Sequence, residues 1–220
     1  MKKGGFFFLF VLLSYYGSAQ ISLGVKTGYG YFTIINDNQM GDKAYYSHCR
    51  DNIILSIEAK QNTTHLLNLG VSLDYVNQSF NVSSQVGGHV TDYKADAKFT
   101  TGSLYFGFKP QFTFGKQVRY FFYPGFIFGT VLHSYADGIV TTNSMDTTGV
   151  TSEINHEGSS YFAPVNFGFL VGMGMDVPLS SRLTLNIENT NNILSGGPSW
   201  GSNKSMLVNL NIFCGLFYRL

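Results

Sequence analysis

Eight charged side chains could do most of the chemistry open to this 220-residue chain. Most of them stand at alternate positions among small or polar residues, between larger apolar neighbours. Where such a face lines an interior, its acids and bases pair with one another, because an unpaired buried charge is costly. The alternative is that these charged groups form a row along the interior and provide a path for protons or ions. The eight candidates are Lys26, Glu58, Lys60, Asp74, Lys109, Arg182, Glu188 and Arg219. We expect Glu58 and Glu188 to be the partners of Lys26, Lys60 and Arg219.

Catalysis has a weak basis in this sequence. His133 and Ser134 are adjacent, and neighbours on a strand point to opposite faces, which separates a base from its nucleophile. The lipid A deacylase family uses a histidine and a serine two positions apart, a spacing that this chain lacks. We therefore predict a protein that is not an enzyme and has no catalytic residue.

Metal and cofactor sites are equally poorly supported. The histidines of the polar stretches, His48, His89 and His156, are too far apart to show a metal-ligand spacing. The acidic residues of these stretches match no calcium-loop pattern: Asp42, Asp92, Asp137, Asp146 and Glu153. We predict no metal and no cofactor, and a net charge of +1 gives no reason to expect nucleic acid.

The composition points to a surface that does not face water alone. Charged residues make up 12% of the chain and aromatic residues 16%, whereas a soluble domain carries about 25% charge. The mean hydropathy of +0.05 is too low for a bundle of apolar membrane helices. A membrane β-barrel reconciles these values, because only every second strand residue must be apolar.

Period-two alternation recurs eight times along the chain. In the segment 21–35, for example, Leu23 and Val25 alternate with Gly24 and Lys26, which gives one apolar face and one small or polar face. The segment 120–132 shows the weakest pattern. The predicted strands are 21–35, 53–60, 67–75, 104–114, 120–132, 165–175, 183–188 and 206–220.

Long polar stretches and short turns alternate between these strands. The long stretches are 36–51, 78–100, 133–160 and 190–204, and the short ones are 61–65, 115–117 and 178–181. This rhythm predicts an all-β, eight-stranded antiparallel transmembrane β-barrel with four long extracellular loops and three short periplasmic turns. The rival architecture is a soluble lipocalin-like barrel, which would turn the apolar face inward.

Aromatic residues support the membrane interpretation. Tyr29, Tyr31, Tyr75 and Tyr161 fall near the long-loop ends of the predicted strands, and Phe112, Phe114, Tyr120 and Tyr218 fall near the short-turn ends. Rings at both headgroup levels are typical of membrane barrels. Other rings face the narrow interior and predict a filled lumen: Tyr105, Phe121, Tyr123, Phe213 and Phe217.

The first 19 residues read as a secretory signal peptide, followed by the barrel domain at 20–220. Lys2 and Lys3 precede an apolar run at 6–13, and Gly17-Ser18-Ala19 offers a cleavage site before Gln20. The alternative, a membrane anchor, needs about 20 apolar residues. Cys49 lies in a polar stretch and Cys214 on an apolar strand face, so we expect no disulfide between them.

Several segments resemble the small PorT-like outer-membrane β-barrel family of Bacteroidota. They are GVKTGYGYF at 24–32, LYFGFKPQFTF at 104–114, YPGFIFG at 123–129 and NLNIFCGLFYRL at 209–220. The resemblance covers nearly all of the chain after the signal segment and rests on pattern rather than on an invariant motif. It implies the cell outer membrane as location. The family's named member is tied to protein secretion and gliding, and no active residue carries over.

Two functions remain open at this stage. The first is a non-enzymatic barrel in outer-membrane lipid, acting as a structural, binding or secretion-associated component. Its extracellular loops would then contact a protein or glycan partner. The second is narrow, porin-like transport of small solutes. The filled lumen favours the first.

Overall fold

The computed structural model describes residues 20–36, 46–62, 67–87, 91–144, 147–157, 165–195 and 205–220. The predicted signal peptide, residues 1–19, lies outside the described residues. The described chain consists of strands and their turns. None of its elements is a helix long and apolar enough to cross a membrane. The strands are β1 (Gln20–Asn36), β2 (Tyr46–Asn62), β3 (Leu67–Gly87), β4 (Thr91–Phe114), β5 (Arg119–Ser144), β6 (Thr147–Glu157), β7 (Val165–Pro178), β8 (Leu183–Ser195) and β9 (Ser205–Arg219).

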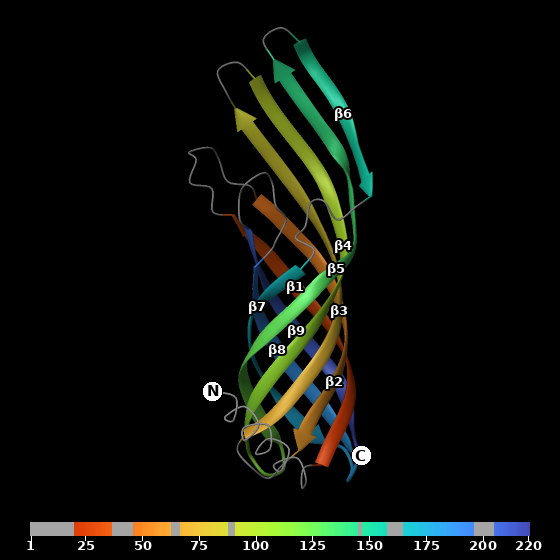
Figure 1. The fold of residues 1–220 in the computed structure, drawn as a ribbon, viewed down its shortest axis with the longest axis vertical. Coiled ribbons are helices and arrows are strands. Elements are labelled where there is room, and N and C mark those ends of the chain that lie inside the picture. The colour runs from red at the N-terminus through yellow and green to blue at the C-terminus, as the bar shows by residue number, and fades with distance from the viewer. Residues whose placement is uncertain are drawn as a thin grey trace, which may run out of the picture.

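Eight of these strands close into one barrel (Figure 1). Neighbours pair antiparallel in the order β4-β3-β2-β1-β9-β8-β7-β5, and β4 also pairs with β5, which closes the sheet. The predicted eight-stranded antiparallel barrel is therefore confirmed. β6 lies outside the closed ring, because it pairs with the far half of β5.

The register sets the stagger of the barrel. Following paired residues once round the ring from Val25 returns to β1 at Ile35, ten residues further along. Strands with such a stagger tilt by about 35–45° to the barrel axis, and eight of them enclose a space that side chains can fill. The path runs through Val25, Ile57, Leu73, Phe106, Phe128, Phe167, Ser195, Met206 and Ile35.

Apolar side chains face outward and polar ones inward. Lys26 is 1% exposed, whereas its neighbour Val25 is 64% exposed. The same alternation holds even in β5, where the sequence pattern was weakest: Phe122 and Phe126 are exposed, and Phe121 and Tyr123 are buried. The predicted phase is confirmed, and the lipocalin-like alternative, with its apolar face inside, is wrong.

Large interior rings lie against glycines of the neighbouring strand. Phe213 stands opposite Gly28 in the register, and a Cβ on Gly28 would lie 2.6 Å from the Phe213 ring. Tyr123 stands opposite Gly172 in the same way. The inward glycines of the alternating pattern therefore make room for the rings that fill the barrel.

The stretches predicted as long polar loops are in part strand. β3 continues to Gly87 and β4 begins at Thr91, so most of 78–100 is a hairpin. Part of 133–160 likewise forms the paired strands β5 and β6. β2 begins at Tyr46, so Cys49 lies in a strand, and β8 runs to Ser195. A sheet that has left the barrel no longer separates lipid from lumen, so it shows no alternation to read.

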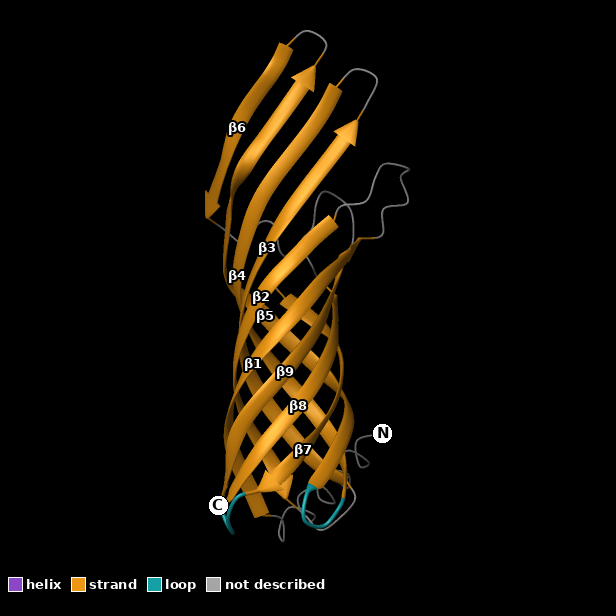
Figure 2. Cartoon of the chain, turned by 180° about the vertical axis from the view of Figure 1, so that it is seen from behind, coloured by secondary structure: helices purple, strands orange, loops and turns teal. Residues whose placement is uncertain are grey.

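These longer strands form a sheet that projects beyond one mouth of the barrel (Figure 2). We call it the projecting sheet; it comprises β2 up to Cys49, β3 from Ser79, β4 up to Thr100, β5 from Tyr135, and β6. The mouth beneath it is the upper mouth. The C-terminus and the turns between β4 and β5 and between β7 and β8 lie at the lower mouth (Figure 1). One of these turns contains Gly115 with a φ of 97°, a left-handed conformation that favours glycine.

Candidate functional site

A network of two lysines and two glutamates occupies the centre of the barrel. Lys26 Nζ lies 2.5 Å from Glu58 Oε2 and 2.8 Å from Glu188 Oε2. Lys109 Nζ lies 2.8 Å from Glu58 Oε2 and 3.2 Å from Glu188 Oε1. The four side chains come from β1, β2, β4 and β8, and each is at most 2% exposed. Their formal charges cancel, so this central network ties four walls together without a net charge.

Neutral groups complete the central network. The Tyr123 hydroxyl donates to Glu188 Oε1, and the Thr190 hydroxyl donates to the same oxygen at 3.1 Å. Gln111 Nε2 donates to Glu58 Oε1 at 3.3 Å. Lys109 Nζ also lies 5.5 Å from the centre of the Tyr123 ring. Every carboxylate oxygen of the two glutamates thus has a donor, as buried charge requires.

A second ion pair lies closer to the lower mouth. Lys60 Nζ is 2.6 Å from both oxygens of Asp176, and Asn186 Nδ2 donates to Asp176 Oδ1 at 2.8 Å. The ammonium also stands 4.0 Å from the centre of the Phe217 ring. We had expected Glu58 or Glu188 as the partner of Lys60, and this expectation is wrong, because the register places Lys60 two positions below Glu58 on β2.

Asp176 was missed in the sequence. It continues the inward series of Gly172 and Gly174 on β7, so the alternation could have identified it as a lumen residue. The predicted strand stopped at Met175, one residue before Asp176, whereas β7 continues to Pro178.

The remaining candidates take no part in these pairs. Asp74 is 8% exposed and accepts a hydrogen bond from Ser72 at 3.2 Å, but its Oδ1 has no hydrogen-bond partner among the described residues. Arg182 is exposed in the β7–β8 turn and donates to the Tyr218 hydroxyl at 3.0 Å. Arg219 is half-buried beside it at the lower mouth. The prediction that Arg182 points into the lumen is therefore wrong, since the strand begins only at Leu183.

The upper lumen holds amides without partners. Both amide atoms of Asn52 and one each of Asn192, Asn209 and Asn211 are buried without a hydrogen bond in the described chain. Apolar side chains share this region, because Leu170, Leu194 and Ile54 are at most 2% exposed. Buried side chains therefore line the interior from the lower mouth to the upper.

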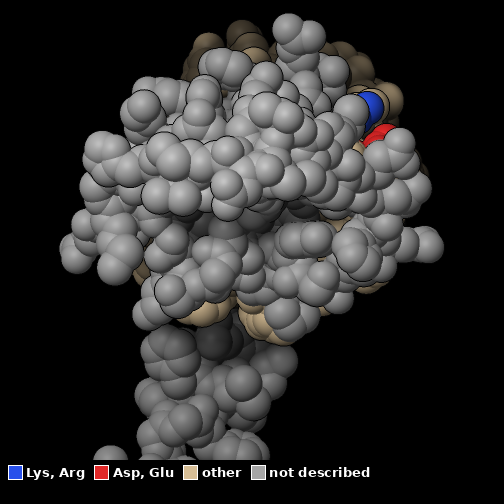
Figure 3. Space-filling model, turned by 90° about the horizontal axis from the view of Figure 1, so that it is seen from above, with Lys and Arg blue, Asp and Glu red and all other residues tan. Residues whose placement is uncertain are grey.

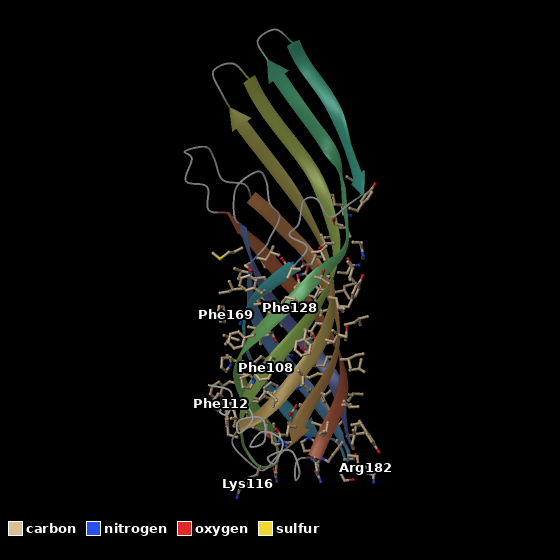
Figure 4. The ribbon with its side chains drawn as sticks, in the orientation of Figure 1. Phe108, Phe112, Lys116, Phe128, Phe169 and Arg182 are labelled. Carbon is tan, nitrogen blue, oxygen red and sulfur yellow. The ribbon has the colours of Figure 1, made fainter. Side chains whose placement is uncertain are left out.

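The outer wall carries a broad apolar surface (Figure 4). Phe167 is 64% exposed and Phe126 60%, and similar side chains stand on all eight barrel strands. Rings mark its ends: Phe114 stacks on Tyr120 near the lower mouth at 5.8 Å between centroids, and Tyr29 and Tyr31 are exposed nearer the upper. Soluble monomers rarely expose apolar surface of this extent.

The residues considered for catalysis remain apart. His133 is exposed on β5 and Ser134 is buried, so the two side chains point to opposite faces, as their adjacency implied. The described side chains include no group of three histidines, cysteines or acids close enough to hold a metal. Asp42, His89 and Asp146 lie outside the described residues.

Among the described strands, the projecting sheet ends in an open edge. β6 is the last strand in the sheet order, and it pairs with β5 alone among the described strands. Lys98 of β4 and Asp137 of β5 are opposite in register and exposed. Seen from above, the visible described surface is mostly uncharged, with a basic group beside an acidic one (Figure 3).

Several solved structures are similar to this chain in fold. Ail, the attachment invasion locus protein of Yersinia pestis, is 10% identical over 90% of this chain and 98% of its own, with a TM-score of 0.37. Neisserial surface protein A is 11% identical over 90% and 97%, with a TM-score of 0.43. The outer membrane protein OprG from Pseudomonas aeruginosa is 17% identical over 92% and 95%, with a TM-score of 0.42. No protein-family model and no curated protein matches the sequence.

Proposed function

We propose that this protein is a non-enzymatic outer-membrane barrel that holds the projecting sheet outside the cell to bind a protein partner. The observation that carries the proposal is the combination of a barrel with a buried central network and a sheet that continues beyond it. The barrel supplies the anchor and the sheet supplies the contact surface. The resemblance to the PorT-like family supports a role beside a secretion complex.

The membrane location rests on the outer wall. Its apolar side chains would be solvated by lipid tails, while every barrel strand has its backbone paired on both sides by ring closure. Cleavage of residues 1–19 by the export machinery belongs to the same proposal. After cell fractionation, the protein starting at Gln20 should stay with the outer membrane through a carbonate wash. Folded protein in the soluble periplasm would contradict the location.

Binding at the projecting sheet rests on the open edge of β6. Exposed edges accept an added strand, and proteins that avoid this use proline or lysine there. The β6 sequence TTGVTSEINHE contains neither, and it is rich in β-branched residues. An extended segment of a partner protein fits such an edge through backbone hydrogen bonds.

Transport is the second candidate and is less well supported. The central network and its surrounding rings fill the interior at the level of Glu58. An open eight-stranded pore would need that space. The mixed charges remain the one feature that favours an ion path.

Two measurements separate these functions. A photo-crosslinking amino acid at Thr151 of β6 should give a discrete adduct in living cells, and the same group at Phe106 on the outer wall should not. Wild-type protein in planar bilayers should show no conductance. Two results together would favour transport over binding as the function. They are stable single-channel currents that Glu58→Ala alters, and no adduct at Thr151.

A further inference from the structure

Two asparagines interrupt the apolar outer face of β8. The inward residues of this strand include Asn186, Glu188 and Thr190, which are buried. The alternate, outward positions are Leu183, Leu185, Ile187, Asn189, Asn191 and Ile193. Asn189 and Asn191 therefore stand on the wall that the proposed membrane would cover.

Asn189 lies close to the middle of the apolar band, and Asn191 lies in its upper part. Leu183 and Ile193 are ten residues apart, about 33 Å along the strand and about 25 Å along the barrel axis, which matches the band of a membrane barrel. Asn189 lies six residues above Leu183 and Asn191 two residues below Ile193. Both positions lie within the band that lipid tails would cover, and lipid tails offer an amide no hydrogen bond.

Apolar residues surround the two amides on both sides. Asn189 is paired across strands with Met173 and Ile212, both 61% exposed. Asn191 is paired with Val171 and Leu210, which are 54% and 47% exposed. Another outward asparagine, Asn77, lies beyond Tyr75 toward the upper mouth. The amide pair on β8 is thus a polar spot within an apolar wall.

The side-chain amides of Asn189 and Asn191 form some of the hydrogen bonds open to them within this chain. Asn191 Nδ2 donates to Asn189 Oδ1 at 3.3 Å, and Asn189 Nδ2 donates to the backbone oxygen of Asn211 at 3.2 Å. A carboxamide offers two donors and an oxygen with two acceptor sites. The hydrogen bonds of the described residues leave one N–H of each amide and the Asn191 oxygen available to an outside group.

We propose that the outward face of β8 is an interface with a second copy of this chain in the plane of the membrane. A twofold axis brings the same patch of both copies face to face. A carboxamide is its own complement, because it donates and accepts, so Asn191 of one copy satisfies Asn191 of the other. Polar side chains hold membrane segments together in this way, since lipid cannot replace them. The apolar neighbours Met173, Val171 and Ile212 pack around the amides. This inference rests on the proposed membrane location.

The test compares association with stability. Purified full-length protein in lipid vesicles, labelled with donor and acceptor dyes, should show energy transfer that persists on dilution with lipid. The double variant Asn189→Leu/Asn191→Leu should associate about tenfold more weakly or not at all. The matched control is Thr27→Leu, which makes an outward polar residue of β1 apolar and should leave association unchanged. Urea unfolding should show both variants folded, because leucine suits a lipid-facing position.

Disulfide trapping gives a second readout. In a Cys49→Ser/Cys214→Ser background, Asn191→Cys should form a covalent dimer under mild oxidation, whereas Leu73→Cys on the outward face of β3 should not. Energy transfer equal in wild type and the double variant would overturn the interface, and so would wild type that is monomeric at every lipid ratio. If the double variant is less stable but still associates, the amides stabilise only the contact between β8 and β9, and the proposed interface is wrong. Recovery of the protein outside the membrane is a different result, which contradicts the proposed location.

Discussion

The lower and upper halves of the lumen use polar residues in opposite ways. At and below the level of Glu58, each buried lysine has a carboxylate within 3.2 Å, and rings lie against the ammonium groups. Above that level, polar groups such as Asn52 and Asp74 have atoms without a partner in the described chain. The buried charges of the lower half form a closed ion-pair network, although Gln61 Nε2 and Asn186 Oδ1 also lack a partner in the described chain. The upper half has no ion pair of this kind among the described residues and relies on apolar packing beside amides that water can satisfy.

This difference teaches where the barrel is least tolerant of change. Charges buried in pairs are destabilising once one partner is lost, whereas amides that have no protein partner lose little when replaced. Replacing a polar side chain by an apolar one of similar size should therefore lower the free energy of unfolding strongly below Asp74 and weakly above it. The predictions below run from the largest expected effect to the smallest.

Glu58→Ala should destabilise the barrel by about 3–5 kcal/mol, because it leaves Lys26 and Lys109 sharing Glu188 as their remaining carboxylate in the central network. Urea unfolding of the refolded protein in detergent or vesicles measures the change. The double variant Glu58→Leu/Lys26→Met should lose less than Glu58→Ala alone. If both variants lose the same stability, the unpaired charge of Lys26 is not the cause of the loss in Glu58→Ala.

The variant Phe167→Arg tests whether a charged side chain is tolerated on the outer wall, as charged side chains are in the lower lumen. A charge on the lipid face costs about 2–4 kcal/mol at the midplane and less near the interfaces, and Phe167 is 64% exposed on that face. Folding yield into vesicles, read from the mobility shift between heated and unheated samples, should fall. The control Phe167→Leu should fold normally. Normal insertion of the arginine variant would contradict a lipid-facing wall.

Asp176→Ala removes the partner of Lys60 nearer the lower mouth. We expect a loss of about 1.5–3 kcal/mol, the range for hydrogen bonds to charged groups. The loss is smaller than for Glu58 because the Lys60 ammonium keeps its contact with Phe217 and lies nearer to water. The same unfolding assay checks it. A loss larger than that of Glu58→Ala would mean that the Lys60–Asp176 pair stabilises the barrel more than the central network does.

Asn52→Leu tests the upper half directly. Both amide atoms of Asn52 lack a partner in the described chain, so replacement by an apolar side chain of similar size should change stability by less than about 1 kcal/mol. The matched variant in the lower half is Asn186→Leu, which removes the donor to Asp176 and should cost more. A large loss at Asn52 would erase the contrast between the two halves.

The membrane strands could be read from the sequence because their constraint is local. Lys26 and Val25 differ in exposure from 1% to 64% over a single step, and any strand between lipid and lumen must alternate in this way. The count of barrel strands, the inward position of Lys109 and Glu188, and the outward position of Phe167 followed from that period alone. The projecting sheet could not be read, because outside the barrel no such constraint acts on β6.

Which residues meet inside the barrel was decided by the tertiary structure. Alternation gives each side chain a face but no neighbour, whereas the stagger of ten residues fixes which strand positions share a level. That stagger pairs Lys60 with Asp176, joins Lys26 to Glu58 and Glu188, and sets Phe213 against Gly28. Alternation is a property of one strand, so the sequence alone determined it. Register belongs to the closed ring, because all eight strands must be paired at once before any interior contact is defined.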